Sequence, residues 1–148
     1  MKKKTQVAAS AFGRWIFCAL FIGAMMVGCE SASEGPQCPS MEEIQAQAAA
    51  LPKGNATSGE KLFADEGCQV CHSLEPNVRV IGPSLSGVSE RATTRKPNYT
   101  ASMYIYESIA YPNAFVVPDF QKNAMPVKFG QTLSQQQFAD LVAFLLTK

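Results

Sequence analysis

The residues with the clearest chemistry are two cysteines and a histidine in the run Cys68-Gln69-Val70-Cys71-His72. The spacing C-x-x-C-H is typical of the covalent attachment of a c-type haem. Two thiols one helical turn apart can each add to a vinyl group of the porphyrin. The histidine that follows is then carried under the iron as an axial ligand. The motif therefore predicts one covalent haem c, held by Cys68, Cys71 and His72.

A C-x-x-C pair has two other common uses in proteins. A thiol–disulfide redox site of the thioredoxin kind requires a βαβ setting, and the surrounding sequence has no such pattern. A zinc site requires two further cysteine or histidine ligands, and His72 is the only histidine. The single histidine also means that this chain cannot supply a second imidazole to the iron, so the second axial ligand is methionine, lysine, water or a group from outside the chain.

Methionine is the predicted second axial ligand. Of the six methionines, three lie within the first 28 residues, Met41 lies in a predicted helix before the main domain, and Met103 lies near the start of another. Met125 instead lies in the loop 123–126, where the proline after it fixes the backbone, so it can approach a haem from the face opposite His72. The alternative is that Met125 is ordinary core filling.

The N-terminus is predicted to be a lipoprotein signal peptide, residues 1–28. Its apolar stretch 15–28 follows a basic segment and is too short to span a bilayer, which takes about 20 residues. It ends on a glycine before Cys29, which resembles a bacterial lipoprotein cleavage site and implies that Cys29 is acylated. An uncleaved signal anchor is the alternative. Either places the domain on the extracytoplasmic, periplasmic side of a bacterial membrane.

The 120 residues after the predicted signal carry nine basic and twelve acidic side chains. This mildly acidic balance excludes nucleic acid as a partner. Residues 29–52 are predicted to be a lipid-anchored tether with a short amphipathic helix at 41–51, which either packs on its own domain or docks a partner subunit. Cys38 in this tether is left over from the other assignments, as a free thiol or half of an intermolecular disulfide.

Residues 53–148 are predicted to form one all-α domain with three main helices and long loops. The first helix runs over about 57–67, the second from an N-cap at Thr100 to near Tyr111, and the third from a capping box at Ser134. Long loops are unusual in a small domain unless something packs inside them. We expect a covalent haem to complete the core. The expected wall residues are Phe115, Phe120, Phe129 and Val127.

The domain resembles a class I c-type cytochrome over residues 57–148. The first and last helices match where those of that fold cross, at Gly59, Phe63, Leu141 and Phe144. The loop Ile81-Gly82-Pro83-Ser84-Leu85-Ser86-Gly87, followed by Arg91, matches the segment after the haem motif.

The resemblance implies roles for three further residues. The Pro83 carbonyl accepts a hydrogen bond from the proximal histidine, and Arg91 neutralises a buried haem propionate, with Tyr99 as a second candidate. The alternative for Arg91 is a solvated surface position. Arg79, Arg95 and Lys96 are expected to face solvent, and Asp119 stands where glycine usually follows the proline.

The segment 107–115 followed by Met125-Pro126 resembles monohaem domains attached to respiratory complexes. Such domains include cytochrome domains of terminal oxidases and the monohaem lipoprotein subunit of alternative complex III, a quinol-oxidising assembly. The expected function is single-electron relay between redox proteins, without catalysis or a small-molecule substrate. The alternatives are an independent lipid-tethered shuttle in a respiratory or photosynthetic chain and, if Met125 does not bind iron, a five-coordinate haem gas sensor or peroxidase.

Overall fold

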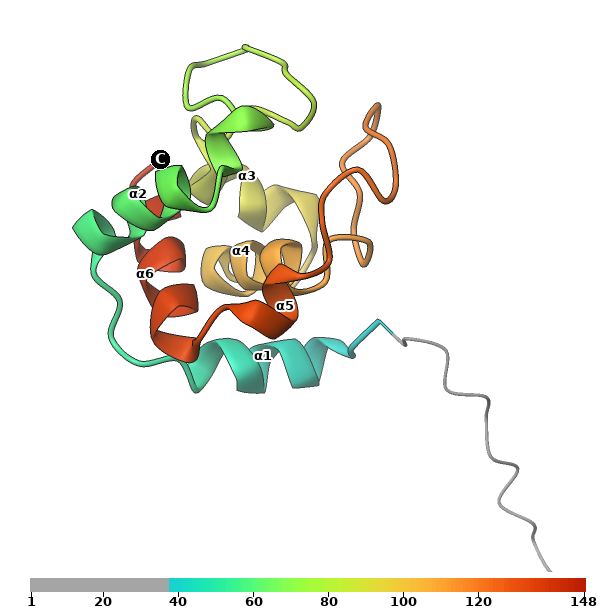
Figure 1. Cartoon of the computed structure of the whole chain (residues 1–148). Helices are drawn as coiled ribbons and strands as arrows, with labels where there is room; N and C mark the ends of the chain where they lie inside the picture. Colours follow the sequence, from blue (N-terminus) through green and yellow to red (C-terminus); the bar gives the residue numbers. More distant parts are fainter. Residues whose placement is uncertain (1–37) are drawn as a thin grey trace, which may run out of the picture. The chain divides into compact units, whose positions relative to one another are not determined.

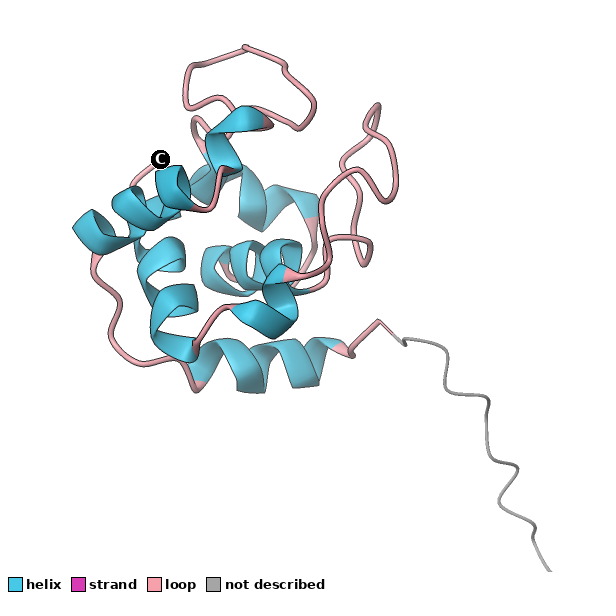
Figure 2. Cartoon of the chain, viewed as in Figure 1, coloured by secondary structure: helices cyan, strands magenta, loops and turns pink. Residues whose placement is uncertain are grey.

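Helices and loops make up the part of the chain that the computed structural model describes, residues 38–148, and this part contains no strand (Figure 2). In chain order the elements are α1 (Met41–Ala49), α2 (Ala56–Asp65), the 3-10 helix η1 (Cys68–Val70), α3 (Val88–Arg95), α4 (Ala101–Ala110), α5 (Phe129–Thr132) and α6 (Gln135–Leu145). The predicted all-α fold class is confirmed. Within these residues no helix combines the length and the apolar character needed to cross a membrane.

The helix starts predicted from the sequence carry side-chain caps. Ser40 accepts a hydrogen bond from the backbone N–H of Glu43 at 3.2 Å, and the Glu43 carboxylate accepts one from the Ser40 N–H at 2.7 Å. Ser134 and Gln137 form the same reciprocal box at the start of α6. The Thr100 hydroxyl caps α4. These bonds satisfy N–H groups that have no partner inside the helix, and each such cap stabilises its helix by about 1 kcal/mol.

The most extensive helix contact is the crossing of α2 and α6. A Cβ atom at Gly59 would collide with the carbonyl group of Asp140, so only glycine allows the two backbones to come this close. The rings of Phe63 and Phe144 meet beside the crossing, with centroids 5.5 Å apart. Both rings are buried. The crossing predicted from these positions is therefore confirmed.

Helix α1 packs against α4 within the same unit. Ile44 is fully buried, and the Gln47 side-chain oxygen accepts hydrogen bonds from the hydroxyl groups of Tyr106 and Tyr111, each at 3.2 Å. The helix packs on its own domain, which was the first of the two interpretations of the segment 41–51. Its opposite, exposed face includes Glu42.

Helices α3 and α5 were not predicted. Helix α3 begins at Gly87, which has a φ of 69° and provides no side-chain cap, and only Val88 and Ala92 are buried on its inner face. Helix α5 has four residues, too few to show a helical period. Neither a start signal nor a periodic pattern was therefore present in these segments.

Two long loops leave this helical framework, as Figure 1 shows in green and in orange. We call residues 73–87, between η1 and α3, the proximal loop. We call residues 111–128, between α4 and α5, the methionine loop. The proximal loop follows His72 directly, and the methionine loop carries Met125, so the two loops bring the predicted axial ligands to the same region.

Candidate functional site

A cavity of about 270 Å³ lies between the helices and the two loops. Its lining is mostly apolar and comes from every helix except α1, and from both loops. The lining includes Phe63, Cys68, Cys71, His72, Gly82, Pro83, Leu85, Val88, Tyr104, Ile105, Ile109, Phe115, Val116, Val117, Phe120, Met125, Phe129, Leu141 and Leu145. Five of the predicted site residues therefore meet in one place: Cys68, Cys71, His72, Pro83 and Met125.

His72 is held in a fixed orientation at the cavity wall. Its Nδ1 lies 2.9 Å from the Pro83 carbonyl oxygen, and because a carbonyl only accepts, Nδ1 carries the hydrogen and donates. Burial lowers the pKa of His72 below its usual value, although the bond to Pro83 acts in the opposite direction. The ring is therefore neutral at pH 7, and its Nε2 lone pair is available to a metal. This confirms the geometry expected of Pro83.

Gly82 makes room for the imidazole. A Cβ atom at this position would lie 2.5 Å from Cε1 of His72 and 2.8 Å from Nδ1. The backbone N–H of Gly82 donates to the Cys71 carbonyl at 2.8 Å, which fixes the loop against the cysteine motif. Any larger residue here would push the ring away from its position.

The two cysteines lie one turn apart on η1 and its end. The N–H of Cys71 donates to the Cys68 carbonyl at 3.2 Å, and the N–H of His72 donates to the same carbonyl at 3.0 Å. Both thiols are partly buried and neither is in a disulfide. Burial raises the pKa of the Cys68 thiol, so this sulfur is protonated at neutral pH. Two unpaired thiols facing an apolar cavity suit thioether bonds to a bound group.

Met125 is the only methionine of the described residues that lines the cavity. Met103 is 5% exposed in the core of α4, and Met41 packs on the surface of the core from α1. The neighbouring Pro126 also lines the cavity, as expected of a proline that fixes this turn. The structure therefore brings His72 and Met125, but no other methionine, to one cavity.

Three of the four predicted wall residues line the cavity, namely Phe115, Phe120 and Phe129. The prediction for Val127 is wrong, because its side chain is 57% exposed and lies outside the lining. The residues on either side, Pro126 and Lys128, do line the cavity. Val127, between these two residues, is instead exposed to solvent.

The structure places Arg91 in a second cavity, of about 420 Å³, next to the first. Its guanidinium group donates to the carbonyl oxygen of Ser84 at 2.8 Å and to that of Ser86. The two cavities share Pro83, Arg95 and Phe120 in their linings. The second is lined by three arginines and by no acidic residue, so it can accept anionic groups. The expected propionate role of Arg91 stays a prediction.

Arg95 is a site residue that the sequence analysis missed. It was expected to face solvent, but it lines both cavities and its Nη1 donates to the Tyr104 hydroxyl at 3.1 Å. Arg91 and Arg95 are four residues apart on α3, so they share one helix face. If the segment 88–95 had been predicted to be a helix, its period would have placed Arg95 on the same face as Arg91.

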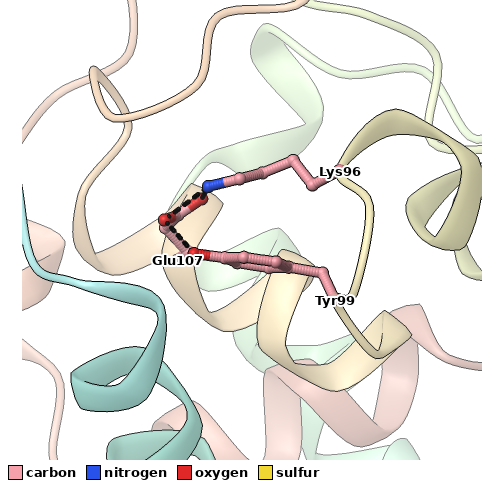
Figure 3. Close-up of polar contacts among 3 residues, drawn as sticks. All are labelled: Lys96, Tyr99 and Glu107. Atoms are coloured by element: carbon pink, nitrogen blue, oxygen red, sulfur yellow. Dashed lines mark hydrogen bonds and ion pairs between the residues drawn. The ribbon is translucent and has the colours of Figure 1, made fainter.

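Tyr99 does not reach either cavity, which corrects its expected role. Its hydroxyl donates to Glu107 Oε1 at 3.0 Å, and the Glu107 carboxylate also receives Lys96 Nζ at 2.5 and 2.8 Å (Figure 3). Glu107 is only 2% exposed, and a buried carboxylate requires such partners. Burial alone would lower the pKa of Lys96, but the hydrogen bonds and charge of Glu107 raise it above its usual value. The polar groups of Tyr99 and Lys96 are therefore both bound to Glu107 on α4.

Within residues 38–148 no three His, Cys, Asp or Glu side chains are grouped to hold a metal ion, as the zinc interpretation would require. Cys38 is exposed and unpaired there. Cys29 and the predicted signal peptide lie outside the described residues.

Residues 56–148 match the family model described as Cytochrome c. The match extends over more than half of the chain and includes every residue that lines the cavity. The chain belongs to the cytochrome c family, and its role is haem-based electron transfer. Family membership implies haem c. The apolar cavity, its two unpaired thiols, the oriented imidazole and the space kept open by Gly82 fit that group.

Proposed function

We propose that this protein is a membrane-anchored monohaem cytochrome that relays single electrons as a subunit of a quinol-oxidising respiratory complex such as alternative complex III. The observation that carries the haem assignment is the meeting of Cys68, Cys71, His72 and Met125 at one apolar cavity. The sequence contains one C-x-x-C-H motif, which supports a single haem.

In this proposal Cys68 and Cys71 bind the porphyrin covalently, and His72 and Met125 are the two axial ligands. The Pro83 carbonyl holds the imidazole ring and strengthens it as a donor, since a hydrogen bond from the second nitrogen raises ligand basicity. The bound haem supplies a reversible one-electron iron couple, and a thioether ligand favours the reduced form. With both axial positions taken by the chain, no position is open to a substrate.

The cavity residues favour electron transfer over acid–base catalysis. His72 is the only histidine, and its Nδ1 is engaged by Pro83. The buried carboxylate of Glu107 is engaged by Lys96 and Tyr99 and does not line the cavity. Among the described residues that line the cavity, Glu66 beside Cys68 is the one carboxylate, and no second histidine is present to pair with it as an acid–base couple, which supports a relay over acid–base catalysis.

The membrane anchor in this proposal is acylated Cys29, on the extracytoplasmic side. Two acyl chains or more are needed for stable anchoring, and a lipoprotein cysteine provides them. The acidic segment before the domain, with Glu30, Glu34, Glu42 and Glu43, and the near-neutral domain argue against a freely diffusing carrier steered by a strong basic surface. The partners in this proposal are other redox subunits of the complex.

The test is purification of the tagged protein from its native membrane in mild detergent, followed by a haem stain of the separated bands. Co-purification with a multihaem protein and integral membrane subunits in a fixed ratio is the expected result. Recovery of the protein alone at every detergent strength would instead make it a lipid-tethered shuttle. Mass spectrometry of the wild-type N-terminus tests the anchor, and a chain that still begins at Met1 and carries no acyl group on Cys29 would refute acylation.

Ligation is tested separately with carbon monoxide. If Met125 binds the iron, carbon monoxide leaves the spectrum of the reduced protein almost unchanged. A rapid and complete spectral change in the wild-type protein would refute this ligand and favour the gas sensor or peroxidase alternative.

A further inference from the structure

One side chain joins the two loops that flank the cavity. Arg79, in the proximal loop, donates from Nη2 to the backbone carbonyl of Asp119 in the methionine loop. Its guanidinium carbon also lies 4.2 Å from the centroid of the Phe120 ring. A planar guanidinium can make both contacts at once, one in its plane and one on its face. We call this contact the Arg79 clasp.

The methionine loop has few other polar connections to the rest of the domain. Within residues 38–148, the hydrogen bonds of the segment 112–127 run to its own residues or to the adjoining Tyr111, with one exception. That exception is the bond from Arg79. The loop therefore depends on the clasp and on apolar contacts to stay closed over the cavity.

The conformation at Asp119 presents the carbonyl to Arg79. Asp119 has a φ of 69°, in the left-handed region that aspartate tolerates better than most residues. The N–H of Phe120 donates to the Val117 carbonyl at 3.2 Å, which closes a turn around this position. Glycine usually stands here in the cytochromes that the domain resembles, and the positive φ explains why that position favours glycine or aspartate.

Phe120 connects the clasp to the cavity. Its ring lines the first cavity together with Met125 and lines the second cavity together with Arg79. A movement of this ring away from Arg79 would open the wall that both cavities share. Because Met125 lies five residues further along the same loop, such an opening would also release the thioether from its place.

We propose that Arg79 is a positioning residue that keeps the methionine loop closed and so holds Met125 at its place in the cavity. The proposal deepens the function given above, since it rests on Met125 as an axial ligand. Arg79 touches neither the histidine nor the methionine, and it acts through Phe120 and the backbone of Asp119.

The experiment measures loop opening in two ways on the haem-loaded protein. A protease that cuts only after lysine is used, because the methionine loop contains the exposed Lys122 and Lys128 and because Arg79 variants then lose no cleavage site. Carbon monoxide association with the reduced protein reports release of Met125. A charged hydrogen bond and a stacked guanidinium together correspond to about a tenfold change in the opening equilibrium at a partly exposed site.

We expect Arg79→Ala to speed both cleavage after Lys122 and carbon monoxide association by about tenfold. Phe120→Leu, which keeps the apolar wall but removes the ring face, is expected to give a smaller increase, because the bond from Arg79 to the Asp119 carbonyl remains. The double variant is expected to add little to Arg79→Ala, because that variant already removes the stacking contact. Arg79→Lys keeps the charge without the planar group, but it also adds a lysine that the protease cuts. It is therefore compared by carbon monoxide association alone, where it is expected to lie between wild type and Arg79→Ala.

Lys61→Ala is the matched control, since Lys61 is an exposed cation on α2, paired only with Asp65. Because this variant loses one lysine site, the comparison uses the rate of cleavage after Lys122 alone. Rates for Arg79→Ala equal to those of this control would overturn the clasp. So would effects of Arg79→Ala and Phe120→Leu that multiply in the double variant. If Arg79→Ala incorporates no haem, Arg79→Lys decides by its rate of carbon monoxide association. If Met125 is not a ligand, wild type and Met125→Ala will bind carbon monoxide equally fast. The cleavage rate of Arg79→Ala still tests the clasp in that case.

Discussion

The proximal loop and the methionine loop flank the same cavity but are held in different ways. In the proximal loop, the backbone N–H of Gly82 bonds to Cys71 and that of Leu85 bonds to Ser73, both at 2.8 Å. The Pro83 carbonyl receives the imidazole of His72. These bonds tie the loop to the cysteine motif through the protein's own backbone.

The methionine loop faces the cavity mainly through apolar side chains. It contributes Phe115, Val116, Val117, Phe120 and Met125 to the lining. Apart from the Arg79 clasp, the hydrogen bonds of its inner segment 112–127 stay within that segment or go to the adjoining Tyr111. Apolar side chains need a surface to pack on, and a haem held in the cavity would supply that surface. The chain therefore fixes the histidine side itself and leaves the methionine side to the cofactor.

The largest expected effect is that of leaving out the haem. In the Cys68→Ala, Cys71→Ala variant, the apolar walls of a cavity of about 270 Å³ are left without the group that they pack on. A small domain has a total stability of only about 5–15 kcal/mol, so the loss of this apolar packing removes a large part of it. We therefore expect the haem-free chain to show no cooperative thermal transition by circular dichroism. A sharp transition with native helix content would show that the helices fold without the cofactor.

A smaller effect is expected from crowding the histidine side. In Gly82→Ala the new methyl group would lie 2.5 Å from the His72 ring, which must move or lose its bond to Pro83. Overpacking of this kind costs about 1–3 kcal/mol. Denaturant unfolding of the haem-loaded protein measures the loss, with Ser86→Ala in the same loop as control. Equal stability of the two variants would mean that the proximal loop yields easily and that the comparison between the loops is wrong.

The same contrast explains which parts of the site could be predicted. The histidine side is encoded locally, because Cys68, Cys71 and His72 are adjacent in sequence and one turn of backbone brings them together. The hydrogen bond between Pro83 and His72 was predicted only from the resemblance to class I c-type cytochromes. Met125 could be chosen because the other methionines lie in predicted helices or within the first 28 residues, and its position in a loop before a proline is itself a local signal.

What the sequence did not reveal depends on packing between distant segments. Arg95 was missed because α3 has no side-chain cap and only two buried residues to show its inner face. Tyr99 was assigned to a propionate because nothing local shows that Glu107 is buried and takes its hydroxyl. The Arg79 clasp joins residues 40 positions apart, and no spacing rule predicts such a contact.

Met125→Ala changes the methionine side alone. We expect reduced protein with this substitution to bind carbon monoxide stoichiometrically and to have a lower reduction potential, because the sulfur that favours ferrous iron is gone. The side chain is only partly buried, so we expect a stability loss of about 1–2 kcal/mol, below the usual range for a buried methionine. Spectroscopic titration and potentiometry provide the two readouts. Unchanged potential and no carbon monoxide binding would assign the second ligand to another group.

The smallest expected effect is a pH dependence at the base of the methionine loop, where Lys96 Nζ lies 6.0 Å from the Phe115 ring centroid and pairs with Glu107. The pKa of Lys96 is raised in the folded protein, so the pair stabilises the fold fully below the unfolded value of about 10.4 and is lost as pH rises through the folded value. One proton sets a limit of about 1.4 kcal/mol per pH unit on the slope. Lys96→Arg stays charged throughout, so unfolding between about pH 9 and 11.5 should show wild type losing stability more steeply than this variant. Parallel curves would mean that Lys96 does not support the methionine loop through its charge.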